Sequence, residues 1–136
     1  MRADDALAER ILRSYRRVAV VGLSPDPSRP SYDVARYLRA VGYEIVAVNP
    51  TIRQWLDLPA YPDLHAVPGP VEVVDVFRRS ELVDPVVDAA IAIGAKAVWM
   101  QDGVVNEPAA ARARAAGLLV VMDRCMLRDH RDLGAP

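Results

Sequence analysis

The sequence predicts an α/β fold built on a parallel β-sheet, and two observations carry this prediction. The first is a series of short apolar runs, such as Val18–Gly22, that end at glycine or proline. Continuous runs of this kind are typical of strands buried on both faces. The second is that amphipathic segments with apolar residues at helical spacing separate these runs, as in Tyr32–Val41. Strands that alternate with helices form a parallel sheet with right-handed crossovers.

The first fifty residues predict one strand–helix–strand unit behind an N-terminal helix. A loop with three prolines follows the first strand, and Gly42 ends the helix that comes next. The second strand is followed by Pro50, which cannot continue the ladder of hydrogen bonds. The predicted elements are helix Ala3–Tyr15, strand Val18–Gly22, helix Tyr32–Val41 and strand Glu44–Asn49.

The rest of the chain repeats this alternation. Asp84 followed by Pro85 predicts a helix start, because aspartate caps helices and proline suits the first turn. The predicted elements are a short edge strand Leu58–Tyr61, strand Val71–Phe77, helix Asp84–Ile93, strand Ala97–Met100, a helix from about Pro108 that ends at Gly117, strand Leu118–Met122 and a last helical turn or two over Cys125–Asp132.

The pattern predicts one Rossmann-like domain over residues 1–136, with the helix of residues 1–16 packed on it. We expect a doubly wound parallel sheet in three αβα layers, with strand order 3-2-1-4-5-6 and Leu58–Tyr61 as the third strand. Ligands of such sheets bind beyond the carboxyl ends of the strands, where the chain reverses direction. Here these ends are Gly22–Ser24 and Phe77–Arg79, with Asn49 and the residues around Gly103 beside them.

Composition narrows the classes of function. The chain has 136 residues, 52% of them hydrophobic, which is enough for a core without disulfides. A net charge of −1 gives no basic field for nucleic acid. No apolar run approaches the ~20 residues that span a membrane, and the charged N-terminus does not read as a signal peptide. One cysteine fits a reducing cytoplasm, and the scarcity of Asn and Gln with 11 prolines is loosely typical of a thermophile.

The loop from Gly22 to Ser31 has two interpretations. A glycine after the first strand, Ser24, Ser31 and Arg29 could hold phosphate at the N-terminus of the next helix. Alternatively, this is an ordinary turn with Ser31 as the helix cap. The three spaced glycines of the dinucleotide fingerprint are absent, and Asn49 stands where NAD enzymes carry an acid. Both departures argue against a nicotinamide enzyme.

Phe77 and Arg78 also have two interpretations. Arg78 and Arg79 at a strand's carboxyl end could hold phosphate oxygens, and Phe77 could lie against a flat base. Otherwise Phe77 belongs to the core and the arginines are solvated. For Phe77 we favour the core, and for Arg78 we favour the ligand.

Other reactive residue types give weaker signals. His65 and His130 have neither metal-ligand spacing nor a catalytic partner, so we predict surface positions and no metal. Asp123 and Arg124 can pair with each other. Cys125 can be an inert core residue, or a redox-active thiol whose thiolate form Arg124 favours.

Several short stretches resemble the stand-alone CoA-binding domain proteins (the YccU-like group) and, more distantly, the CoA-binding domain of the succinyl-CoA synthetase α subunit. Together, and in this order, they cover residues 18–130. They are Val20–Ser24, Arg29–Tyr32, Ala47–Pro50, Val76–Ser80, Gly94–Lys96, Trp99–Gln101 before Gly103, and Met122–Met126.

The resemblance implies a Rossmann-like fold that binds coenzyme A or an acyl-CoA through its adenosine-phosphate part. It implies phosphate contacts for Gly22, Ser24, Arg29 and Ser31. It implies contacts with the sugar or base for Asn49 and Pro50, and with adenine and ribose phosphate for Phe77 and Arg78. Gly103 completes the expected ligand-binding residues.

The synthetase's phosphohistidine lies in a second domain that this sequence does not contain, so ligase activity is not implied. We expect binding without catalysis, and a protein partner stays open. The alternatives are a CoA- or nucleotide-dependent transferase or ligase component that uses Asp102 or Asp123, and a NAD(H)-sensing module.

Overall fold

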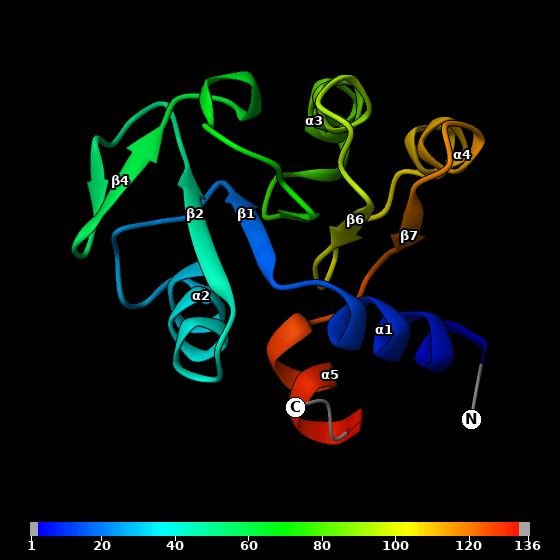
Figure 1. The fold of residues 1–136 in the computed structure, drawn as a ribbon, viewed down its shortest axis with the longest axis horizontal. Coiled ribbons are helices and arrows are strands. Elements are labelled where there is room, and N and C mark those ends of the chain that lie inside the picture. The colour runs from blue at the N-terminus through cyan, green and yellow to red at the C-terminus, as the bar shows by residue number, and fades with distance from the viewer. Residues whose placement is uncertain (1–2, 134–136) are drawn as a thin grey trace.

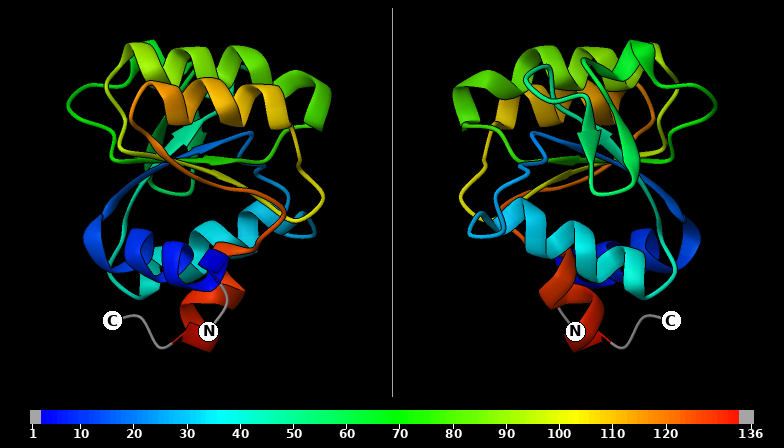
Figure 2. Two further views of the ribbon diagram at one scale, coloured as in Figure 1. Left: turned by 90° about the vertical axis from the view of Figure 1, so that its right-hand side faces the viewer. Right: turned by 90° about the vertical axis from the view of Figure 1, so that its left-hand side faces the viewer.

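The computed structural model describes residues 3–133 as a seven-stranded sheet between two layers of helices (Figures 1 and 2). The strands are β1 (Arg17–Val21), β2 (Glu44–Val48), β3 (Gln54–Trp55), β4 (Leu58–Tyr61), β5 (Val73–Val76), β6 (Ala97–Met100) and β7 (Leu119–Val121). The helices are α1 (Ala3–Ser14), α2 (Pro30–Ala40), α3 (Val83–Ala92), α4 (Glu107–Ala115) and α5 (Met126–Leu133), with short 3-10 turns at Leu64–Ala66 and Ser80–Leu82.

The sheet confirms the predicted fold class and adds one strand. Its order is β3-β4-β2-β1-β5-β6-β7, and the six strands from β4 to β7 in this order are parallel. Within them the predicted order 3-2-1-4-5-6 is present. The unpredicted strand is β3, which pairs antiparallel with β4 at the outer edge. Two residues are too short for a periodic signal, and β3 forms because Trp55 is almost completely buried there.

The core consists of two apolar layers, one on each face of the sheet. Successive residues of a strand point to opposite faces. In β1, Ala19 and Val21 therefore pack toward α3 and α4, while Val18 and Val20 pack toward α1, α2 and α5. Figure 2 shows the same division of the helices into α3 and α4 on one face and α1, α2 and α5 on the other.

The start of α3 differs from the prediction that Asp84 caps it. The helix begins at Val83 after a 3-10 turn, and Leu82 is its cap residue, with no side-chain hydrogen bond. Asp84 lies inside the first turn, where its carboxylate accepts from Asn106 at 3.1 Å and pairs with Arg112 at 3.0 Å. Hydrogen bonds from Asn106 and Arg112 lower the pKa of Asp84. This aspartate links α3 to α4 and caps neither.

Helices α1 and α5 pack together through one arginine. Arg124, just before α5, pairs with Asp129 at 2.7 Å and with Asp5 of α1 at 2.7 Å. The predicted pairing of Arg124 with Asp123 is therefore wrong, because Asp123 takes a left-handed backbone conformation (φ 56°) and binds elsewhere. No helix in the described part of the chain has the length and apolar character to cross a membrane.

The two histidines have different environments. His65 is exposed, as predicted. His130 is 6% exposed, so the prediction of a surface position is wrong. Its Nδ1 and the Tyr37 hydroxyl share a hydrogen bond of 2.7 Å, and the rings of Tyr37 and Tyr43 meet it edge-on. His130 is thus a polar link between α5 and α2.

Candidate functional site

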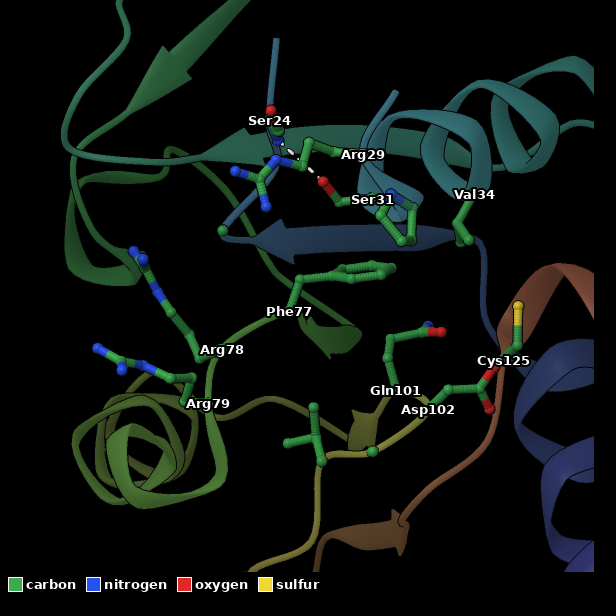
Figure 3. A pocket seen from close by; sticks show the side chains of 14 residues that line it. Ser24, Arg29, Ser31, Val34, Phe77, Arg78, Arg79, Gln101, Asp102 and Cys125 are labelled. Atoms are coloured by element: carbon green, nitrogen blue, oxygen red, sulfur yellow. Dashed lines mark hydrogen bonds between the residues drawn. The ribbon is translucent and has the colours of Figure 1, made fainter. Parts of the chain in front are cut away.

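A pocket of ≈ 590 Å³ opens at the carboxyl ends of β1, β5 and β6, at the predicted switch in chain direction. Pockets of about 300–1,000 Å³ are typical of small-molecule sites. Eight of the ten candidate residues line it, from four separate segments of the chain. The lining is Gly22, Ser24, Arg29, Pro30, Ser31, Val34, Phe77, Arg78, Arg79, Gln101, Asp102, Gly103, Val104 and Cys125 (Figure 3).

The loop between β1 and α2 is braced by its own hydroxyl groups. α2 begins at Pro30, and Arg29 is its cap residue without a side-chain hydrogen bond. Ser31, the alternative cap, lies inside the first turn, where its Oγ accepts the N–H of Ser24 at 3.0 Å. The Ser24 Oγ accepts the N–H of Asp26 at 3.0 Å. These bonds brace the loop, and Ser24, Arg29 and Ser31 all line the pocket.

Gly22 is required by the fold at the base of this loop. Its φ is +87°, and a Cβ placed on it would lie 2.2 Å from the backbone oxygen of Phe77. The glycine therefore allows the ends of β1 and β5 to approach each other. Gly22 also lines the pocket, and its predicted contact with phosphate stays a prediction.

Phe77 is half-buried against the core layer of α1, α2 and α5 and also lines the pocket, so both interpretations of this residue hold in part.

Two cationic side chains reach the pocket without forming a salt bridge. Arg78, the residue after Phe77, is half-buried. Within residues 3–133, neither Arg29 nor Arg78 forms an ion pair. Arg79 is exposed and lies 3.7 Å from Glu81.

The opposite end of the pocket is built from the residues after β6 and β7. Arg128 of α5 donates two hydrogen bonds to Asp102, at 2.8 and 3.0 Å, and lowers the pKa of this carboxyl. The N–H of Gly103 donates to Asp123 Oδ1 at 2.7 Å. Cys125 is half-buried at this end. In Figure 3 the three arginines lie on one side and Gln101, Asp102 and Cys125 on the other.

A buried acid lies behind Gln101. Asp75 in β5 has no exposed surface, and its Oδ1 accepts a hydrogen bond from Gln101 Nε2. Its other oxygen, Oδ2, has no partner. Burial raises the pKa of Asp75 to about 8, and the hydrogen bond from Gln101 opposes this only in part.

Asn49 and Pro50 do not line the pocket. The Nδ2 of Asn49 donates to the backbone oxygen of Leu23 at 2.9 Å, and its Oδ1 accepts from the N–H and the hydroxyl of Thr51. Trp55 adds a hydrogen bond from Nε1 to the backbone oxygen of Ser24, at 3.1 Å. These side chains fix the β1–α2 loop, and the predicted ligand contacts of Asn49 and Pro50 stay predictions.

Six lining residues lie outside the set of ligand-binding residues expected from the resemblance. Three of them were already considered at strand ends: Arg79 as a phosphate ligand, Asp102 as a catalytic acid and Gln101 as a neighbour of Gly103. Pro30, Val34 and Val104 are ordinary helix and loop residues, and no local pattern singles them out. No group of three metal-ligating side chains occurs in the residues that the structure describes.

Comparison with known proteins agrees with this geometry. Residues 16–131 match the family described as CoA binding domain. The uncharacterized protein YneT of Bacillus subtilis (strain 168) is 40% identical over 122 residues, which is 90% of either chain. A hypothetical protein from Pyrococcus horikoshii OT3 is 38% identical and superposes with a TM-score of 0.94, covering 99% of this chain and 97% of that one.

A larger protein contains a similar domain. The dinucleotide forming acetyl-coenzyme A synthetase 1 of Ca. Korarchaeum cryptofilum is 27% identical, with a TM-score of 0.72. The match covers 83% of this chain but 27% of the synthetase. The family match, the identity to these relatives and the shared fold show that this chain belongs to the family of CoA-binding domains.

Proposed function

We propose that this domain binds coenzyme A, or an acyl derivative of it, in the pocket at the ends of β1, β5 and β6. The observation that carries the proposal is that Arg29 and Arg78 reach the pocket without a salt bridge to a carboxylate in the described chain, while the charge of Arg29 acts on Asp26 in its own loop. An unpaired guanidinium group is suited to phosphate oxygens, which it binds through paired hydrogen bonds. Coenzyme A carries three phosphates, and membership of the family supports this ligand.

The two ends of the pocket carry different side chains, and this difference orients the proposed ligand. The phosphates face Arg29 and Arg78, and the pantetheine arm runs toward Gln101 and Cys125 at the other end. In this arrangement Phe77, between the two ends, offers an apolar face to the ligand. The loop hydroxyls of Ser24 and Ser31 lie at the phosphate end.

We infer a role in binding, as a carrier, a sensor or a subunit of a larger assembly. The two acids considered for catalysis both have structural partners. Asp102 accepts two hydrogen bonds from Arg128, and Asp123 accepts the N–H of Gly103. Carboxylates held in this way fix the loops after β6 and β7, which supports binding over proton transfer.

Coenzyme A is expected to raise the melting temperature by several degrees at 100 times its dissociation constant, because ligand binding stabilises only the folded state. NAD should have little effect, since the loop after β1 lacks the spaced glycines of a dinucleotide site. The measurement is a thermal-shift series with coenzyme A, acetyl-CoA, NAD, NADP and ATP. A shift with NAD and none with coenzyme A contradicts the proposal.

Arg78→Ala is expected to weaken coenzyme A binding about ten- to a hundredfold, because a charge-assisted hydrogen bond is lost. Calorimetric titration measures the affinity. Arg79→Ala is the matched control and should have a smaller effect, since Arg79 is exposed and lies near Glu81. Dephospho-CoA separates the roles: if Arg78 holds the ribose phosphate, its loss matters little for that ligand. Equal losses with both ligands assign Arg78 to another contact.

Cys125 is expected to form a mixed disulfide with the ligand under oxidation. Its thiolate attacks one sulfur of CoA disulfide, a protein–CoA disulfide forms and one CoA thiolate leaves. The sequence suggested that the positive charge of Arg124 favours the thiolate of Cys125. Arg124 instead forms ion pairs with Asp129 and Asp5, so its charge is not free to do this. Intact-mass spectrometry should show a reductant-sensitive gain of one CoA, absent in Cys125→Ser. Unmodified wild-type protein that still binds coenzyme A contradicts the prediction.

A further inference from the structure

Asp75 is an ionisable side chain enclosed by apolar neighbours. It stands in the central strand β5, in register with Val20 of β1 and Trp99 of β6, and both are completely buried. Because alternate residues share a face, Asp75 points to the same side as Val73, whose layer packs against α1, α2 and α5. A carboxyl group in such a place is expected to have a full set of hydrogen bonds, yet Oδ2 has none.

The link between Asp75 and the pocket is the Gln101 side chain. Gln101 lines the pocket, and its Nε2 donates to Asp75 Oδ1. No described group donates to its Oε1. A 180° rotation of the terminal amide exchanges Nε2 and Oε1 without moving any other atom. The same contact then runs in the opposite sense, from a protonated Asp75 to Oε1.

We propose that Asp75 and Gln101 form a proton-coupled switch that sets which edge of the Gln101 amide faces the bound ligand. With Asp75 ionised, Gln101 donates to it and presents its carbonyl oxygen to the pocket. With Asp75 protonated, the carboxyl O–H donates to Oε1 and Gln101 presents its N–H donors. The ligand side of this inference rests on the proposed binding of coenzyme A, whereas the switch itself does not.

The charged side chains near this face of the sheet are paired with one another, so none of them offsets the charge of an ionised Asp75. From the helices and loops packed here come Arg124 with Asp5 and Asp129, and Arg128 with Asp102, each closed into ion pairs. The other ionisable side chains in this layer are Cys125, His130 and the tyrosines Tyr15, Tyr32, Tyr37 and Tyr43. None of the described charged groups pairs with Asp75, and Gln101 is its hydrogen-bond partner.

An uncompensated buried carboxyl group holds its proton, because the low dielectric disfavours the charge. Burial places the pKa of Asp75 at about 8, so the protonated state dominates at neutral pH. Gln101 then offers N–H donors, which select an acceptor oxygen. Gln101 lies away from the arginines, toward Cys125 (Figure 3), so this acceptor is a carbonyl oxygen of the pantetheine arm.

The switch is tested first without ligand, by NMR titration between pH 6 and 10. The carbon-13 signal of the Asp75 carboxyl reports ionisation, and the nitrogen-15 and proton signals of the Gln101 amide report its orientation. The two sets of signals are expected to shift together. In Asp75→Asn, which keeps the shape and removes the ionisation, the Gln101 signals should not move. If the Gln101 signals of the wild-type protein do not shift when Asp75 ionises, the switch is overturned.

The ligand arm of the test is the affinity for coenzyme A at the same pH values. Wild-type affinity is expected to fall about tenfold more than that of Asp75→Asn as pH rises through 8, the equivalent of one hydrogen bond. The phosphate and thiol groups of coenzyme A titrate equally in both proteins and cancel in the comparison. Gln101→Met keeps Asp75 but has no amide, so it should lose the same part of the pH dependence of affinity as Asp75→Asn does. It replaces Asp75→Asn in this test if that variant does not fold.

Adenosine 3′,5′-bisphosphate, which lacks the pantetheine arm, separates the two subsites. Its pH dependence should be the same in the wild-type protein and both variants. Identical profiles for coenzyme A in the wild-type protein and Asp75→Asn overturn the role of the switch in recognition. If coenzyme A fails to bind at any pH while the Gln101 signals still follow Asp75, the proposed function fails and the switch stands.

Discussion

Gly22→Ala is expected to lower the free energy of unfolding by about 2–5 kcal/mol. A left-handed φ costs alanine about 1–2 kcal/mol, and forcing an atom into a packed position costs about 1–3 kcal/mol more. The obstacle is the Phe77 carbonyl oxygen, 2.2 Å from the added Cβ, and it cannot rotate away as a side chain does. The ladder holds this site on both sides, since Gly22 N–H donates to Val48 and Phe77 N–H donates to Val21.

Chemical denaturation of Gly22→Ala and Gly94→Ala measures this effect against a matched control. Gly94 has a similar φ of +75°, but nothing lies within 4 Å of its added Cβ. Gly94→Ala should therefore show only the conformational cost. Equal losses in the two variants are the result that contradicts a steric role for the Phe77 carbonyl.

Asp75→Asn is expected to remove a pH dependence of about 4 kcal/mol between pH 4 and pH 7 from the stability of the protein. The pKa of Asp75 is about 8 in the folded state, against the ordinary 3.8. Folding therefore retains a proton that the unfolded chain releases, and wild-type stability falls as pH rises from about 4 to about 8. Each pH unit in this window is worth about 1.4 kcal/mol, so three units from pH 4 to pH 7 give about 4 kcal/mol.

Unfolding of both proteins in urea, from pH 4 to pH 9, measures this difference. Relative to the wild type, Asp75→Asn should gain stability steadily up to pH 8 and no further above it. The side-chain N–H of the variant is buried without an acceptor, which lowers its stability by about 1–3 kcal/mol at every pH. This cost shifts the plot of the stability difference against pH but does not change its slope. A difference between the proteins that is constant with pH contradicts the raised pKa.

Local patterns were enough to predict the parallel sheet, because each central strand is a short apolar run buried on both faces. The same patterns failed where a distant partner decides the structure. Asp84 has the local sequence pattern of a helix cap, yet its carboxylate accepts a hydrogen bond from Asn106 and pairs with Arg112. His130 looks like a surface residue on a polar helix, yet Tyr37 lies 93 positions earlier and covers it.

The same distinction holds for the pocket. The order of the elements placed Gly22 and Arg78 at strand ends and Arg29 in the loop before the next helix, and all three line the pocket. Asp75 in β5 pairs with Gln101 just after β6, 26 positions along the chain. Asp75 is a charged residue inside an apolar run, which marks it in the sequence, but the run does not show what it contacts. Its importance follows only from the register of β5 with β6.

The contact between Asp5 and Arg124 has a consequence for protein synthesis. It joins residues 119 positions apart, so α1 leaves the ribosome long before the segment that it binds. Until β7 and α5 have emerged, α1 lacks these partners, and its apolar residues Ala8, Ile11 and Leu12 are not fully covered. Docking of α1 is therefore completed only after α5 has been made, when the strands between them are already available to pair.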